Sequence, residues 1–188
     1  MNNKIKRLKD GNKNGYLEET SEDGSITKAN YIDGKPDGLA EIFYPNGQLK
    51  SRCFFKNGKV NGPMEEYYKD GKLKNERVLK NNKFCGYSKS YLPDGTLWLS
   101  NNYENDELHG IQIQYFESGA IKEKSYMIKG SMDGIYEWYY ENGQLYFRHQ
   151  RYKGKRHGIF EKYNEDGSVI KFEKYVNGLL IKENKSES

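Results

Sequence analysis

The sequence predicts an all-β fold: an elongated, twisted single antiparallel sheet of about seven tandem β-hairpin repeats, each of about 24 residues. Three observations predict it. Glycines recur at a constant spacing, aromatic and aliphatic residues recur at the same spacing, and a turn motif lies between them in most repeats. A period of this length is typical of repeat proteins, in which each unit packs against its neighbours.

The glycines define the repeat. Those that open successive repeats lie 24 residues apart, at Gly38, Gly62, Gly86, Gly110, Gly134 and Gly158, and Gly15 precedes them by 23. A second glycine follows each of these after nine residues. We therefore expect one array over residues 1–188, with an N-terminal half-unit at 1–14, repeats beginning near 15, 38, 62, 86, 110, 134 and 158, and a C-terminal tail at 179–188.

The turn motif predicts how each hairpin closes. The segments "PNG" at Pro45 and "EDG" at Glu165 fit a three-residue loop, a type I turn followed by a glycine in the left-handed region. Such a loop places an aromatic row directly across from an aliphatic row, with both on one face. The aromatic row is Phe43, Tyr67, Tyr91, Tyr115, Tyr139 and Tyr163, and the aliphatic row is Ile26, Leu49, Leu73, Leu97, Ile121, Leu145 and Val169.

A second turn, as in "NGKVNG" from Asn57 to Gly62, joins one hairpin to the next. In two repeats Asn82 and Asp106 replace its first glycine. Both residue types tolerate a positive φ better than most, so we expect the same turn there.

The charge is unevenly distributed. The net charge is +4, and residues 1–14 account for all of it. The remaining residues are neutral overall, whereas a nucleic-acid-binding protein needs a net basic face. We therefore expect no nucleic-acid partner and interpret the basic N-terminal arm as a solvated end.

No segment resembles a signal peptide or a transmembrane helix. Cys53 and Cys85, the two cysteines, do not suggest a disulfide framework. These observations predict a cytoplasmic protein.

The sequence predicts no catalytic, cofactor-binding or metal site. His109 and His157 occupy one turn slot two repeats apart, about 19 Å, which is too far to share a zinc ion. The glutamates that recur at one slot are interpreted as a surface ladder paired with nearby lysines; they are Glu18, Glu41, Glu65, Glu137 and Glu161. No nucleophile–base pair or phosphate-binding loop is present, so we do not expect an enzyme.

The segment "IYEWYYENGQLYFRHQRYKGKRHG" (Ile135 to Gly158) is unusually rich in rings. Alternation places Tyr136, Trp138 and Tyr140 on the face opposite the aromatic row, where most repeats are more polar. The three-residue loop predicts Tyr146 across from Trp138 and Arg148 across from Tyr136. Tyr, Trp and Arg are enriched in interface hot spots, so these five residues are the predicted partner-binding site. The alternative is that the sheet curls and buries this face.

A weaker candidate is the basic turn that follows, with Arg151, Lys153, Lys155 and Arg156. It could contact phosphates or acidic lipids. The alternative is an ordinary solvated connecting turn, because "GKxxG" recurs in other repeats.

The repeat, a glycine followed by paired aromatic residues, [D/N]-G-x-[L/I] and then G-K-x-[D/H]-G, resembles the bacterial variant of the MORN repeat. It is clearest in Gly38 to Gly62 and Gly134 to Gly158. The resemblance implies a non-enzymatic scaffold that binds a protein partner. Free-standing arrays of this kind resemble the YwqK-type antitoxin family, which implies a toxin as the partner. A carbohydrate-binding protein of the cell envelope and a module that docks on lipid headgroups are the alternatives.

Overall fold

The computed structural model describes residues 14–185, which form strands joined by turns. The predicted half-unit at 1–14 lies outside them except for Asn14. The chain divides into two compact units, Met1–Gly95 and Thr96–Ser188. The predicted all-β, antiparallel hairpin fold is confirmed in each.

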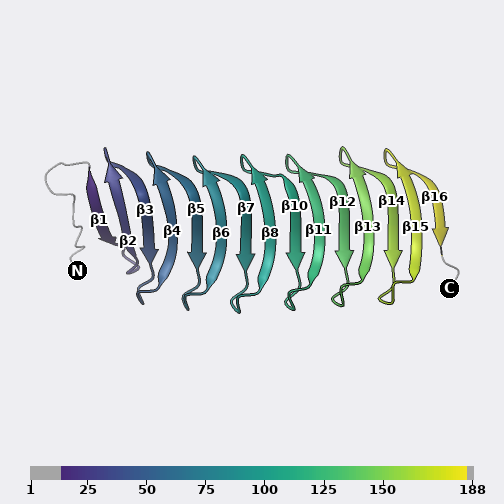
Figure 1. Cartoon of the computed structure of the whole chain (residues 1–188), viewed down its shortest axis with the longest axis horizontal. Coiled ribbons are helices and arrows are strands. Elements are labelled where there is room, and N and C mark those ends of the chain that lie inside the picture. Colours follow the sequence, from purple (N-terminus) through teal and green to yellow (C-terminus); the bar gives the residue numbers. More distant parts are fainter. Residues whose placement is uncertain (1–13, 186–188) are drawn as a thin grey trace. The chain divides into compact units, whose positions relative to one another are not determined.

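The first unit is an open antiparallel sheet in which each strand pairs with the next in sequence (Figure 1). Its strands are β1 (Gly15–Thr20), β2 (Ile26–Ile32), β3 (Lys35–Phe43), β4 (Leu49–Lys56), β5 (Lys59–Tyr67), β6 (Leu73–Lys80) and β7 (Lys83–Tyr91).

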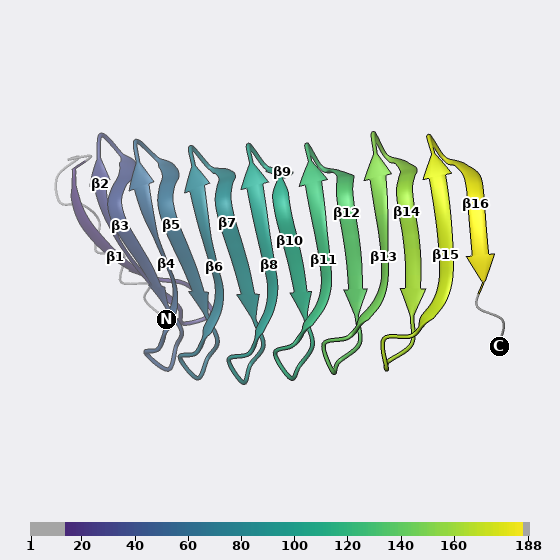
Figure 2. The same cartoon turned by 45° about the vertical axis from the view of Figure 1, so that its right-hand side comes forward.

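The second unit has the same plan (Figure 2), except that the short β9 pairs with β8 and lies off the main path. Residues 179–185, expected to be a tail, instead form a strand that pairs with β15. The strands are β8 (Leu97–Glu104), β9 (Glu107–Leu108), β10 (Gly110–Tyr115), β11 (Ile121–Ile128), β12 (Ser131–Tyr139), β13 (Leu145–Tyr152), β14 (Lys155–Tyr163), β15 (Val169–Val176) and β16 (Leu179–Lys185).

The hairpin loop has the predicted three residues. Tyr44 N donates to Gln48 O at 2.8 Å, and Gly47 N donates to Tyr44 O at 2.9 Å. Gly47 has φ 84°, in the left-handed region that glycine adopts without steric cost. Phe43 lies directly across from Leu49, so the aromatic and aliphatic rows share one face, as predicted. We call this the row face and the other the reverse face.

The strand register shifts by one residue next to each such pair, on the side away from the hairpin loop. Phe43 faces Leu49, but the preceding Ile42 faces Ser51, so Lys50 is an extra residue on β4. This is a β-bulge, which adds one residue to one strand and increases the local twist. The same shift recurs where Tyr67 faces Leu73 and where Tyr139 faces Leu145. The sequence pattern did not predict this bulge.

The second turn has two residues, both with positive φ. Asn57 and Gly58 have φ 50° and 78°, and the flanking Lys56 and Lys59 face each other. These features define a type I′ turn, whose twist matches that of the strands. Asn82 and Asp106 adopt φ 68° and 71° at the glycine position, so the prediction made for them is confirmed.

Hydrogen bonds link several of the hairpins to the next one along the chain. The hydroxyl of Tyr44 donates to Tyr67 O at 2.8 Å, and that of Tyr68 donates to Tyr91 O at 2.7 Å. At the type I′ end, Gly58 N donates to Pro36 O at 2.8 Å. The second aromatic residue of the repeat therefore has a structural function in these hairpins.

The core is thin and lies on the reverse face. Ala29, Ala40 and Ser125 are buried there, with 5%, 8% and 6% of their surface exposed. None of the larger side chains in the described residues is fully buried. Small buried residues let neighbouring strands pack closely, and most other side chains are half-buried.

Two of the glycines that open the repeats make room for a cross-strand ring. Gly134 has φ 130°, and a Cβ placed on it would lie 3.2 Å from the Cβ of Tyr126. Gly62 has φ 137° and the same relation to Phe54, at 3.5 Å. Backbone conformation and close contact therefore both favour glycine at these positions.

Candidate functional site: a ring cluster on the second unit

The ring-rich segment forms β12 and β13 in the second unit. Tyr139 lies across from Leu145 on the row face. Tyr136 and Trp138 alternate with Tyr139 along β12, so they lie on the reverse face, as predicted. Both side chains are half-buried. The reverse face is therefore neither fully exposed nor fully buried at these two rings.

The predicted cross-strand partners of these rings are wrong. Trp138 faces Phe147 instead of Tyr146, and Tyr136 faces His149 instead of Arg148. The reason is the bulge, which makes Tyr146 the extra residue and moves each later residue of β13 by one position. A one-residue shift exchanges the faces of a strand, so Phe147 and His149 join the reverse face.

Arg148 consequently lies on the row face. It faces Glu137 across the strand pair, and its Nε donates to a carboxylate oxygen of Glu161. It is not part of the ring cluster. The recurring glutamate is paired here, but Arg148 takes the place of the lysine that we expected, as Arg52 does beside Glu65 at 2.6 Å.

Phe147 is the centre of the cluster. Its ring centroid lies 6.0 Å from Trp138, 5.7 Å from Tyr136 and 6.1 Å from Phe160, with the ring planes nearly parallel. Tyr146 contacts Phe147 edge-on at 5.3 Å. Such pairs contribute about 0.5–1.5 kcal/mol each beyond the burial of their area. We define the ring cluster as Tyr136, Trp138, Tyr146, Phe147, His149 and Phe160.

Cations surround the ring cluster. The Nζ of Lys122 lies 5.7 Å from the ring centroid of Trp138, and that of Lys162 lies 5.0 Å from Tyr146. The guanidinium of Arg156 lies 5.9 Å from Phe160. A cation is attracted to the face of an aromatic ring. The ring cluster therefore has an apolar centre with positively charged groups at its edge.

His149 is neutral within the ring cluster. Its ring stacks on Tyr136 at 4.9 Å. Burial lowers the pKa of His149 from its ordinary value of 6.5 to about 4, and the charges of Arg151 and Arg156 lower it further in the same direction. Burial, with the nearby carboxylate of Glu123, raises the pKa of Tyr136 to about 12. Both rings are therefore uncharged at neutral pH.

Tyr140, predicted to bind a partner, has a structural contact. Its hydroxyl donates to Tyr163 O at 3.1 Å, the same link that Tyr44 and Tyr68 make in the first unit. Its ring also meets Tyr146 edge-on at 4.9 Å. Tyr140 thus supports the ring cluster as well as joining two hairpins.

The basic turn borders the ring cluster. Arg151 lies directly across from Arg156, and Arg151 Nη1 donates to Gly154 O at 2.9 Å. Lys153 occupies the first position of a type I′ turn, with φ 49°, and Lys155 faces Tyr152. Lys153 and Lys155 are therefore ordinary turn residues in position, whereas Arg156 lies over the ring of Phe160 and the charge of Arg151 acts on His149.

The fold does not require rings at these positions. In the repeat that begins at Gly38, the positions of Tyr136, Trp138, Phe147 and His149 are occupied by Ala40, Ile42, Ser51 and Cys53. None of those side chains carries a ring, yet the strands pair in the same register. The ring cluster is thus specific to one part of the array.

The remaining candidate residues have local contacts. His109 N donates to Asn102 O at 2.9 Å, and Asn177 N donates to His157 Nδ1 at 3.5 Å. His109 lies between β9 and β10, whereas His157 lies within β14 and accepts its hydrogen bond from the turn that follows β15. Cys53 and Cys85 are free thiols, and burial raises the pKa of Cys53.

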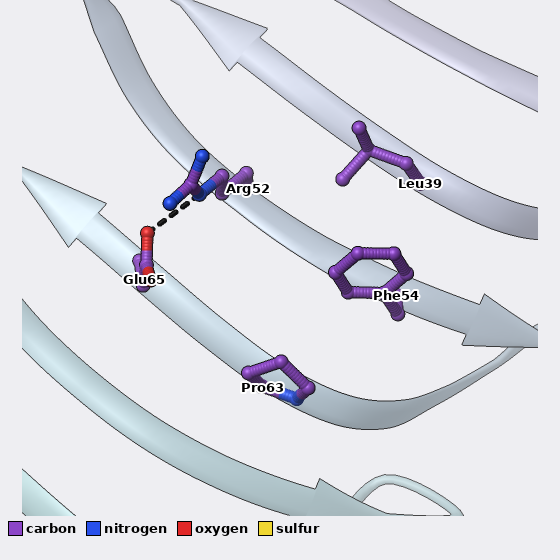
Figure 3. A pocket seen from close by; sticks show the side chains of 5 residues that line it. All are labelled: Leu39, Arg52, Phe54, Pro63 and Glu65. Atoms are coloured by element: carbon purple, nitrogen blue, oxygen red, sulfur yellow. Dashed lines mark hydrogen bonds and ion pairs between the residues drawn. The ribbon is translucent and has the colours of Figure 1, made fainter.

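A series of hollows lies on the row face, which the sequence pattern did not predict. In the first unit Leu39, Phe54 and Pro63 line a hollow of about 280 Å³, bounded by the Arg52–Glu65 ion pair (Figure 3). In the second unit corresponding residues line two more, which share Ile135. The residues that follow the opening glycines, such as Leu39, Pro63 and Ile111, line these hollows. The 24-residue period could therefore have identified the lining residues from the sequence.

Four segments of the chain match the family model of the MORN repeat variant, at residues 36–57, 60–81, 108–129 and 132–153. They cover just under half of the chain, two in each unit. The chain therefore contains MORN-variant repeats, which form a repeat scaffold. The last matched segment contains Tyr136, Trp138, Phe147 and His149. No curated protein matches the chain.

Within residues 14–185, no helix is long and apolar enough to cross a membrane.

Proposed function

We propose that the chain is a non-enzymatic scaffold that binds a protein partner through the ring cluster of the second unit. The observation that carries this proposal is a contiguous set of half-buried rings at positions where another repeat holds side chains without rings. Because the fold does not need the rings, a function other than folding accounts for them best.

The chemistry of the ring cluster suits a protein surface. Interface hot spots are enriched in Trp, Tyr and Arg, and they sit in well-packed centres from which water is excluded on binding. Trp138 is held in place by Phe147 on one side and Lys122 on another. A preorganised anchor loses little conformational freedom on binding. The surrounding cations favour a partner with carboxylates around an apolar centre.

A toxin as the partner is supported by the resemblance of the array to YwqK-type antitoxins. In that case the chain would neutralise the toxin by covering its surface, without any chemical step. The first partner to test is the product of the neighbouring reading frame.

The test measures the affinity of the full chain for that product by isothermal titration calorimetry. Trp138→Ala should weaken binding by more than about 2 kcal/mol, roughly thirtyfold in Kd, because it removes the anchor. Trp98→Ala is the matched control, since Trp98 is 42% exposed and lies outside the ring cluster. It should change Kd by less than about threefold.

Circular dichroism establishes that both variants are folded. Equal affinities for wild type and Trp138→Ala would contradict the assignment of the site. Enzymatic turnover of the partner, or retention on cell-wall glycans with no affinity for the protein, would contradict the proposed function.

A further inference from the structure

Five exposed lysines line one end of the row face in the first unit. They flank the type I′ turns and are Lys35, Lys56, Lys59, Lys80 and Lys83. Lys56 lies directly across from Lys59, and Lys80 lies directly across from Lys83. We call this group the lysine ridge. Neighbouring strands are about 4.8 Å apart, so its charges lie close together.

The lysine ridge is electrostatically unfavourable by itself. Like charges that face each other across a strand pair destabilise a sheet. Within the described residues, Lys56 is the ridge member with an ion pair, to Asp37 at 3.8 Å, and its side chain is still 66% exposed. At the slot of Asp37 the next two repeats have Asn61 and Cys85, which carry no compensating carboxylate.

The fold does not require lysine at these positions. In the second unit the corresponding cross-strand pairs are Glu104 with Glu107, Ile128 with Ser131, and Tyr152 with Lys155. The same turn thus accepts acidic, apolar and mixed pairs. A run of lysines confined to the first unit is therefore best explained by an anionic ligand.

An apolar hollow lies beside the lysine ridge. Leu39 and Phe54 face each other there with 38% and 43% of their surface exposed, and Pro63 completes the lining (Figure 3). Phe54 precedes Lys56 by two residues on β4, so the two side chains point the same way about 7 Å apart. Arg52 and Glu65 neutralise each other at the far side.

We propose that the row face of the first unit binds an acidic, amphipathic segment of a protein, with apolar side chains in the hollow and carboxylates on the lysine ridge. The positive charge of the lysine ridge implies that the segment is acidic, and the apolar hollow implies that one side of the segment is apolar. A phosphodiester strand would match the lysines but leave the apolar hollow unused. This surface lies in the other unit from the ring cluster and does not depend on it.

The probe is a short fluorescein-labelled peptide that alternates leucine and glutamate, and fluorescence anisotropy measures its binding to the full chain. The variant Lys56→Gln/Lys59→Gln/Lys80→Gln/Lys83→Gln should bind the peptide at least about tenfold more weakly, because each of the four lysine charges that it removes attracts the glutamates of the peptide. Removing facing like charges should leave its stability in urea unchanged or higher, so weaker binding would not result from unfolding.

The matched control replaces four lysines of the second unit, as Lys153→Gln/Lys155→Gln/Lys174→Gln/Lys182→Gln, and should retain wild-type affinity for the peptide. Phe54→Ser should weaken binding of the peptide, and Trp138→Ala should leave it unchanged. The proposal is overturned if both quadruple variants bind alike or if the Phe54 change has no effect. It is also overturned if single-stranded DNA or anionic phospholipid vesicles bind more tightly than the peptide.

Discussion

At the scale of single residues, His149 makes the stability of the second unit depend on pH. Its ring stacks on Tyr136, and its pKa falls from 6.5 to about 4 in the folded chain. The unfolded chain therefore takes up a proton at a pH where the folded chain does not. Stability contributed by neutral His149 is present above about pH 6.5, decreases as the pH falls towards about 4, and changes no further below that.

The variant His149→Phe keeps a ring in the stack but cannot be protonated. We expect its free energy of unfolding to vary less than that of wild type between pH 7 and pH 4.5, while the two stay within about 1.5 kcal/mol of each other at pH 7. Urea denaturation at several pH values measures this. Identical pH profiles for the two proteins would show that His149 is not the titrating group.

At the scale of the element, the turn between hairpins tolerates residues that do not suit it. Lys129 has φ 48° at the first position of a type I′ turn, where other repeats have Asp33 or Asn57. A left-handed conformation costs most residues about 1–2 kcal/mol, whereas Asn adopts it more readily. Lys129→Asn should therefore raise the free energy of unfolding by about 0.5–1 kcal/mol, measured by urea denaturation.

The reciprocal change, Asn57→Lys, is the control for this prediction and should lower the free energy of unfolding by a similar amount. If both changes proved neutral, side-chain contacts rather than backbone conformation would decide the choice of residue at the turn.

The hairpin also shows which features could be predicted from the sequence. Turn type follows from residues adjacent in the chain, such as Asn46 and Gly47, so the three-residue loop and the shared face of Phe43 and Leu49 were predicted correctly. The bulge has no residue signature, because Lys50, Tyr146 and Ile170 all occupy its extra position. The partners of Trp138 and Tyr136 were consequently displaced by one residue, and Phe147 and His149 were missed.

At the scale of the whole chain, periodicity predicted the repeat fold well because each strand pairs with its neighbours in sequence. It predicted the candidate sites less well. The lysine ridge depends on which of Lys56, Lys59, Lys80 and Lys83 face each other, and the hollow depends on how far Leu39 and Phe54 remain exposed. Both are properties of packing between strands, which no single repeat encodes.

This nearest-neighbour organisation predicts that damage stays local. Leu79 is 9% exposed and lies between Gly62 and Phe84 on adjacent strands. Leu79→Ala should cost about 2 kcal/mol, the lower end for a buried leucine, because the thin core leaves the site partly able to collapse. In repeat arrays stability is approximately a sum of unit and interface contributions. Hydrogen exchange should therefore accelerate in β5–β7 and change little in β13–β15.

Met127→Ala is the matched variant in the second unit, because Met127 lies between Gly110 and Met132 in the same way. It should produce the opposite pattern, with faster exchange in β10–β12 and little change in β3–β5. If either substitution accelerated exchange equally in all strands, the chain would unfold as one cooperative body, and the additive description of its stability would be wrong.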